Sequence, residues 1–306
     1  MSSGALPQPA GSGLEELRTA PRSDSLPLHR RLWKALGRSG QARFGLGVIV
    51  FMILFSFVGV FITHQSPTAV SVFQSLQPPS ALHPMGTDEY GRDLFARTIY
   101  GGQVSIVIGL SVVLVGAVGG TIIGLLCGLN RTLDRILMRL VDAAMAVPVI
   151  LLAIALLALL KPSVMNVVIS LGVVAIPRTA RVVRASALVT GQEEYVTAAR
   201  ALGASWLRLT VRHVLPNILS PLIIQSTFNF ASAVLNEAAL SFLGVGLPPN
   251  TPAWGSDLSN GQDFVYQAPW LTVFPGIAIV VMVLGVNLFG DGLRDVLDPL
   301  HRNANS

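Results

Sequence analysis

The sequence predicts an all-α membrane protein with six transmembrane helices and both termini in the cytoplasm. Three observations predict this class. Of the 306 residues, 52% are hydrophobic and only 12% are charged, and the mean hydropathy is +0.63, which is far more apolar than an ordinary soluble domain. Six stretches lack Asp, Glu, Lys and Arg and have roughly the 20 residues that a spanning helix needs. Finally, Lys and Arg gather in alternate connections between these stretches.

The six uncharged stretches are the predicted spans. They cover residues 44–62, 103–129, 143–160, 162–177, 214–236 and 264–290. Pro148, Pro221 and Pro275 lie inside the third, fifth and sixth spans and predict kinks there. The fourth stretch is short for a span, so we expect its helix to continue past the charged residue Arg178.

The distribution of basic residues orients the chain, because cytoplasmic connections carry the excess of Lys and Arg. Of the 21 Lys and Arg residues, seven precede the first span, three follow the second, six follow the fourth and two follow the sixth. The opposite side holds only Arg92, Arg97 and Lys161. This asymmetry predicts cytoplasmic tails at 1–43 and 292–306, the first of them Pro/Gly/Ser-rich and largely disordered.

Several function classes are excluded by enumeration. Cys127 is the only cysteine, so no disulfide within the chain is possible. The net charge of +5 does not indicate nucleic-acid binding, because the basic residues lie between apolar runs. Neither His-Glu-x-x-His nor Gly-x-Ser-x-Gly occurs, and Lys34 and Lys161 do not stand in a phosphate-binding loop. We therefore expect no catalytic site, no metal site and no ATPase motif in this chain.

The connection after the fourth span is predicted to fold outside the membrane. Thr190 and Glu193 stand at capping-box spacing ahead of 195–202, which predicts a helix start. Gly203 interrupts that helix, Ser205 caps a second short one, and Pro216 opens the fifth span. The apolar residues of this helical pair lack an obvious cover in their own chain, which indicates a partner protein. A surface-lying segment in contact with lipid is the alternative.

This connection resembles the EAA loop of the permease subunits of ATP-binding-cassette (ABC) importers, the element that docks into the ATPase. Ala198-Ala199, Gly203 and Leu215-Pro216 carry the resemblance, whereas Thr197 and His213 stand where Glu and Ile are typical. The resemblance implies a coupling loop at about 190–216. Its candidate residues are Tyr195, Thr197, Ala198, Ala199, Arg200, Leu202, Gly203, Ala204, Trp206, Arg208, Leu215 and Pro216.

Further runs resemble the C-type permease of dipeptide and oligopeptide importers, in the peptide/nickel family. They are the runs at 83–93, 100–102, 240–244, 248–249, 254–255 and 287–299. Together they cover nearly everything from the first span to the tail, in the correct order. The resemblance implies that 44–101 form the first transmembrane helix and an external loop, and that 102–291 form the permease core.

The resemblance also implies a type I ABC importer permease fold and a set of partners. These are a second, B-type permease subunit, two cytoplasmic ABC ATPases that use ATP and Mg²⁺, an extracytoplasmic solute-binding protein and membrane lipid. This chain itself would bind no cofactor. The implied function is to form half of a peptide pathway through the bacterial cytoplasmic membrane.

Residues of the spans and of the external loop supply further candidates. Glu237 is the one acidic residue placed within or at the edge of a span, near Asn236 and Asn229, and both a pathway-lining role and a structural hydrogen-bonding role are open. In the external loop, Asp88, Arg92 and Asp93 face either solvent or a docked binding protein.

Two sets of regularly spaced residues have simpler interpretations. Gly116, Gly120, Gly124 and Gly128 form a smooth face that favours packing inside one subunit over a partner contact. Two arginine stripes are predicted to anchor lipid headgroups; they are Arg131, Arg135 and Arg139, and Arg178, Arg181 and Arg184.

Two alternatives to the importer subunit differ in class. A self-sufficient ion-coupled carrier or channel would act without an ATPase and would depend on Glu237. An intramembrane enzyme is the other, although the sequence lacks the usual catalytic constellations.

Overall fold

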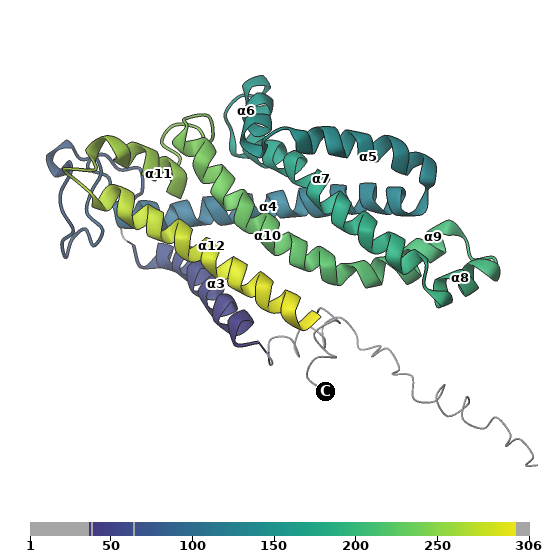
Figure 1. Cartoon of the computed structure of the whole chain (residues 1–306). Coiled ribbons are helices and arrows are strands. Elements are labelled where there is room, and N and C mark those ends of the chain that lie inside the picture. The colour runs from purple at the N-terminus through teal and green to yellow at the C-terminus, as the bar shows by residue number, and fades with distance from the viewer. Residues whose placement is uncertain (1–36, 38, 64, 298–306) are drawn as a thin grey trace, which may run out of the picture.

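The computed structural model describes residues 37, 39–63 and 65–297, which form an elongated arrangement of helices (Figure 1). Across these ranges, extended pairing is confined to one isolated β-bridge between Thr87 and Asp93. Most of the two predicted tails, including most of the segment predicted to be disordered, lies outside the described residues; 40–43 and 292–297 are helical.

The helices follow the uncharged stretches of the sequence. The bounds are α3 Gly40–Val58, α4 Leu94–Leu129, α5 Arg131–Ala146, α6 Val149–Leu159, α7 Val164–Gly191, α8 Glu194–Ala201, α9 Trp206–Leu209, α10 Leu215–Phe242, α11 Trp254–Gly261 and α12 Trp270–Leu297. Short 3₁₀ segments lie at Gly59–Phe61, Val72–Gln74 and Gln262–Phe264, and a π-helical segment lies at Thr210–Val214.

Five predicted spans are confirmed as helices that are long and apolar enough to cross a membrane; they contain α3, α4, α7, α10 and α12. The expectation that the fourth continues past Arg178 is correct, because α7 runs on to Gly191. Helix α4 begins nine residues before the predicted span, since Asp93 caps it by accepting a hydrogen bond from the Ala96 N–H.

The third predicted span, 143–160, is not one straight helix. It consists of the end of α5 and the short α6, which meet at an angle of 96°. The backbone is extended at Val147 and non-helical at Pro148. Proline has no N–H to donate within a continuous helix, and its ring clashes with the preceding helical turn. The kink predicted at Pro148 is therefore a complete break.

Helix α4 packs along α7 through the glycine face predicted in the second span. A Cβ atom at Gly124 would lie 2.6 Å from Cβ of Val183, and one at Gly128 would lie 2.7 Å from Cβ of Ala187. These separations are shorter than real Cβ contacts, so only glycine permits this approach. The glycine face therefore packs inside one subunit, as the sequence favoured.

A second close pair consists of α3 and α12, which lie side by side (Figure 1). Gly45 of α3 lies against the Gly285 carbonyl oxygen, where a Cβ atom would approach to 2.6 Å. At the α12 end, Gly292 faces the backbone of Ala42. Helix α10 contacts α12, α4 and α7, and so links the two close pairs.

The two ends of the molecule carry different structures. Helices α8 and α9 lie at one end, and α11 lies at the other beside the connection between α3 and α4 (Figure 1). This separation matches the predicted coupling loop and external loop, which the sequence assigns to opposite sides of the membrane.

Gly124→Ala should destabilise the protein even though alanine favours helices by about 1 kcal/mol. The added Cβ would lie 2.7 Å from the Ala180 carbonyl oxygen, and overpacking typically costs about 1–3 kcal/mol. The midpoint of thermal unfolding in detergent should therefore fall. Gly47→Ala is the matched control, because nothing lies within 4 Å of that position. Equal midpoints for the two variants would contradict the close packing of α4 on α7.

Candidate functional site

The coupling segment, residues 192–214 between α7 and α10, contains two short helices joined by a tight turn. Gly203 ends the first helix with a φ of +82°, a left-handed conformation that favours glycine. The Ser205 hydroxyl then accepts a hydrogen bond from the Arg208 N–H and caps α9, as predicted. Gly203 thus reverses the chain between α8 and α9.

The predicted capping box at Thr190 and Glu193 is wrong. Thr190 lies within α7, which extends to Gly191, so its buried side chain is not at a helix start. Helix α8 begins at Glu194 instead, with Glu193 as an N-cap residue whose side chain makes no capping bond.

The coupling segment presents a row of exposed apolar side chains. The exposed fraction is 89% for Leu202, 63% for Leu207 and 47% for Trp206. Val196 and Leu209 are buried and hold the two helices to the rest of the chain. Of the other predicted residues, Tyr195, Thr197, Ala198, Arg200, Gly203, Arg208 and Pro216 are exposed, and Ala199, Ala204 and Leu215 are half-buried. Exposed apolar groups gathered at one place indicate a binding surface.

A polar contact joins α8 to the beginning of α10. The Asn217 amide donates to the Tyr195 hydroxyl at 3.0 Å and to the His213 carbonyl oxygen at 2.7 Å. Partial burial, together with the nearby Glu193 carboxylate, raises the pKa of the Tyr195 phenol, so it stays protonated at neutral pH. The intervening π-helical segment Thr210–Val214 makes the coupling segment continuous with the fifth span.

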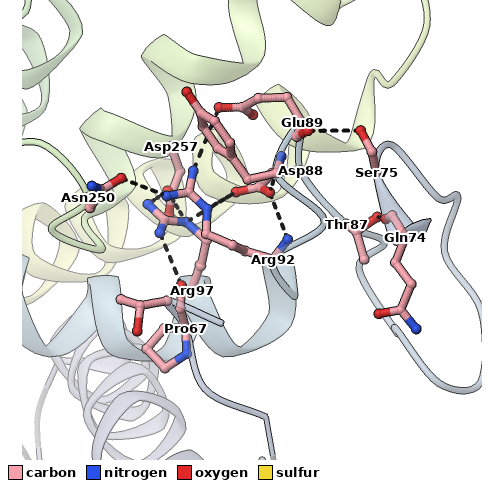
Figure 2. Close-up of polar contacts among 12 residues, drawn as sticks. Pro67, Gln74, Ser75, Thr87, Asp88, Glu89, Arg92, Arg97, Asn250 and Asp257 are labelled. Atoms are coloured by element: carbon pink, nitrogen blue, oxygen red, sulfur yellow. Dashed lines mark hydrogen bonds and ion pairs between the residues drawn. The ribbon is translucent and has the colours of Figure 1, made fainter. Parts of the chain in front are cut away.

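A buried charge network occupies the opposite end of the molecule (Figure 2). The Arg97 Nε donates to Asp257 at 2.7 Å, and its Nη1 donates to the Pro67 carbonyl oxygen at 3.2 Å. Arg92 pairs with Asp88 through Nε and donates to Asn250 at 3.1 Å. These contacts join the connection before α4 to the loop before α11, and α4 itself to α11.

Of the two alternatives for the external charges, the solvated one is wrong. Asp88, Arg92, Asp93 and Arg97 are all at most 4% exposed. Each has a charged or polar partner, because an isolated buried charge would cost several kcal/mol. Asp93 accepts from the Ala96 N–H at 2.7 Å and contacts His83 Nδ1 at 2.8 Å.

Burial changes the pKa of two carboxyl groups of this network. It raises the pKa of Asp257 above its ordinary value, although the Arg97 guanidinium opposes that change. Burial likewise raises the pKa of Glu89, against a backbone hydrogen bond that stabilises its charged form. Arg97 is therefore the group that opposes the effect of burial on the pKa of Asp257.

The polar residues of the fifth span have different surroundings. Glu237 is fully buried and accepts hydrogen bonds from Ser105 at 3.1 Å and Ser241 at 2.8 Å. These contacts correspond to the structural hydrogen-bonding role, one of the two alternatives for this residue. Asn229 is also buried, and its amide donates to Thr179 of α7 at 2.9 Å. Asn236 is half-buried and lines a small pocket together with Asn229.

Two arginines of α7 form ion pairs, which the prediction of headgroup anchoring did not anticipate. Arg181 lies 2.7 Å from Asp142, and Arg184 makes a bidentate pair with Asp134. Both acidic residues belong to α5, so these pairs hold α5 against α7. Arg178, the third member of the stripe, lines the same pocket as Asn229 and Asn236.

Sequence reasoning missed Asp257, Asn250 and the roles of Ser105 and Thr179. Arg97 and Asp257 are 160 positions apart, and Ser105 and Glu237 are 132 positions apart. No local spacing relates such partners. The one available signal was Asp257 itself, an acidic residue close after the Trp254-Gly255 run.

Comparison with protein families gives two matches. The family described as binding-protein-dependent transport system inner membrane component matches residues 120–303. The family described as the N-terminal TM domain of oligopeptide transport permease C matches residues 28–79.

Individual relatives are similar over most of the chain. A protein of Brucella suis named as a peptide transport system permease is 49% identical over 87% of this chain and 90% of its own. The di/tripeptide transport system permease protein of Pseudomonas aeruginosa is 40% identical over 95% of this chain and 100% of its own. Among solved structures, a chain of the MetNI methionine ABC transporter in an inward-facing conformation matches with a TM-score of 0.57 and 20% identity, over 66% of this chain and 97% of that chain.

Arg97→Leu should destabilise the protein strongly, because it leaves the Asp257 carboxylate buried without its partner. Breaking a buried pair from one side typically costs about 3–5 kcal/mol. Arg181→Leu is the control, since its pair with Asp142 is at least half exposed on both sides and such pairs contribute about 0.2–1 kcal/mol. Thermal unfolding in detergent should separate the two variants clearly. Similar midpoints would mean that the Arg97–Asp257 pair does not hold the external end together.

Proposed function

The chain belongs to the family of binding-protein-dependent transport system inner membrane components, and on this premise we propose that it forms half of the pathway of a bacterial peptide importer. It is a multi-pass membrane permease subunit of an ABC importer. The likeness to the MetNI chain confirms the predicted type I permease fold. Membership of this family favours the importer subunit over the self-sufficient carrier and the intramembrane enzyme.

The exposed apolar row of the coupling segment is the observation that carries the proposed docking to an ATPase. Leu202, Trp206 and Leu207 are exposed; Leu202 lies outside the five long apolar helices, and the other two are the first residues of the one that contains α10. Large apolar side chains at a helical end need a protein cover in the assembled state. Two cytoplasmic ABC ATPases would supply that cover, and ATP and Mg²⁺ would bind to them rather than to this chain.

The same segment supports a route for transmitting ATPase closure to the spans. Helix α9 continues through the π-helical segment into α10, and Tyr195 of α8 contacts Asn217 of α10. A displacement of α8 and α9 would therefore move the beginning of α10 as one body, and α10 contacts α4, α7 and α12. Such rigid-body coupling exchanges inward-open and outward-open states.

A second permease subunit and an extracytoplasmic solute-binding protein complete the proposed assembly. The names of the relatives support peptides as the substrate class. The proposed surface for the binding protein is the external end of the chain, which the buried ion pairs around Asp88 and Arg92 hold in one shape. The test is uptake of a labelled dipeptide by liposomes that contain the complex purified with this chain. Uptake that needs neither ATP nor the binding protein would contradict the proposal.

Leu202→Asp should abolish co-purification of the ATPases and leave the fold intact. The side chain is 89% exposed, so the charge is solvated in the free chain but would be desolvated in an apolar interface. Pull-down of the tagged chain from native membranes would measure ATPase recovery. Tyr266→Asp is the control, because Tyr266 is 99% exposed in the connection between α11 and α12, and α11 lies at the opposite end of the molecule. Equal ATPase recovery for both variants would contradict docking at this segment.

Gly203→Val should uncouple ATP hydrolysis from transport while the protein still inserts into the membrane. Nothing lies within 4 Å of a Cβ atom at this position, so the added side chain does not clash. The conformational strain of valine at a φ of +82° is what destabilises the turn. A strained residue there typically costs about 1–3 kcal/mol and would change the angle between α8 and α9. Peptide uptake per ATP hydrolysed, measured in liposomes, should fall at least tenfold. Normal coupled uptake would count against the role of this turn.

A further inference from the structure

Three unpaired polar side chains converge on one small pocket between the long helices. Arg178 of α7 and Ser232 and Asn236 of α10 all line it. None of the three side chains makes a hydrogen bond or ion pair with another described residue, unlike Arg181 and Arg184 on the same stripe. Asn229, at the same pocket, is already bonded to Thr179 and Gln225.

The pocket lies at the depth of the membrane. Thr179, next to Arg178, packs against Gly120 of α4. Gly120 is nine residues from the end of the uncharged stretch 103–129, which corresponds to about 14 Å along a helix. An ionisable group at such a depth is costly and typically belongs to a functional site.

A helix N-terminus adds to the preference of the pocket for an anion. Val149, the first residue of α6, lines the pocket, and no side chain caps this end of α6. Free N–H groups at a helix N-terminus attract negative charge. The Arg178 guanidinium prefers planar, bidentate acceptors, of which a carboxylate is the simplest.

We propose that this pocket binds the C-terminal carboxylate of the transported peptide during passage through the membrane. Arg178 holds the carboxylate, and Ser232 and Asn236 bond to the adjoining peptide group. The pocket has a volume of about 30 Å³, which suits one terminal group rather than a whole peptide. Arg178 is exposed at its mouth, so the rest of the peptide would lie in the space that a second permease encloses. The inference rests on the proposed function.

The test compares two dipeptides that differ only in a free or an amidated C-terminus. Uptake is measured in liposomes with the complete transporter and saturating loaded binding protein. Arg178→Gln should lower uptake of the free-acid dipeptide about tenfold, the typical effect of losing one charge-assisted bond. It should change uptake of the amide less than twofold, and Arg178→Lys should retain part of the activity. Capture by the binding protein affects all variants equally and cancels from the comparison.

Arg181→Gln is the matched control, because it removes the same charge one turn further along α7. If Arg178 only anchors a lipid phosphate, each of the two variants should lower the uptake of the free acid and of the amide by the same factor. That result would overturn the inference. If the wild-type complex does not take up the amide, equal losses of free-acid uptake in the two variants would overturn it as well.

Asn236→Asp provides a test that does not depend on the folding of Arg178 variants. It keeps the side-chain volume and places a competing carboxylate in the pocket, so free-acid uptake should fall about tenfold. Wild-type uptake in this variant would overturn the inference. If the wild-type complex takes up neither dipeptide, the proposed function itself fails, and this outcome is distinct from a failure of the pocket alone.

Discussion

The cost of an unpaired charge away from water is the constraint on which most of this structure depends. Arg97 and Asp257 are buried together, and each would be strongly destabilising alone. Arg184 and Asp134 hold α5 against α7 in the same way. Glu237 has no cationic partner among the described residues and is held by two serine hydroxyls instead. The chain thus uses each of these groups to join elements that are distant in the sequence.

This constraint gives the two ends of the molecule different properties. At the end near α11, Arg97 of α4 forms a buried ion pair with Asp257 of α11 and donates a hydrogen bond to the Pro67 carbonyl oxygen in the connection before α4. The end near α8 and α9 has few such bonds, and its apolar side chains remain exposed. The first arrangement suits a surface of fixed shape, whereas the second suits a surface that is completed by a partner. The two surfaces fit the proposed binding protein outside the membrane and the proposed ATPase inside it.

Between the ends, close helix packing supplies the rigidity that transmission requires. The glycine face of α4 lets α7 approach so closely that a single added Cβ atom would clash at several positions. Helix α10 contacts both, and it continues through the π-helical segment into α9. Arg178 stands out in this scaffold, because its charge lies at membrane depth without a partner among the described residues.

The sequence by itself determined the apolar spans, the family resemblance and the positions of the coupling loop and its glycine turn. These features are local, because hydropathy, turn residues and short motifs are read over neighbouring positions. Only the tertiary structure decided that the external charges are buried, that α5 and α6 form a broken helix and that Thr190 lies inside α7. The partners of Arg97 and Glu237 are more than a hundred positions away. Whether a charge is solvated, paired or free depends on what the fold places beside it, and local sequence patterns do not contain that information.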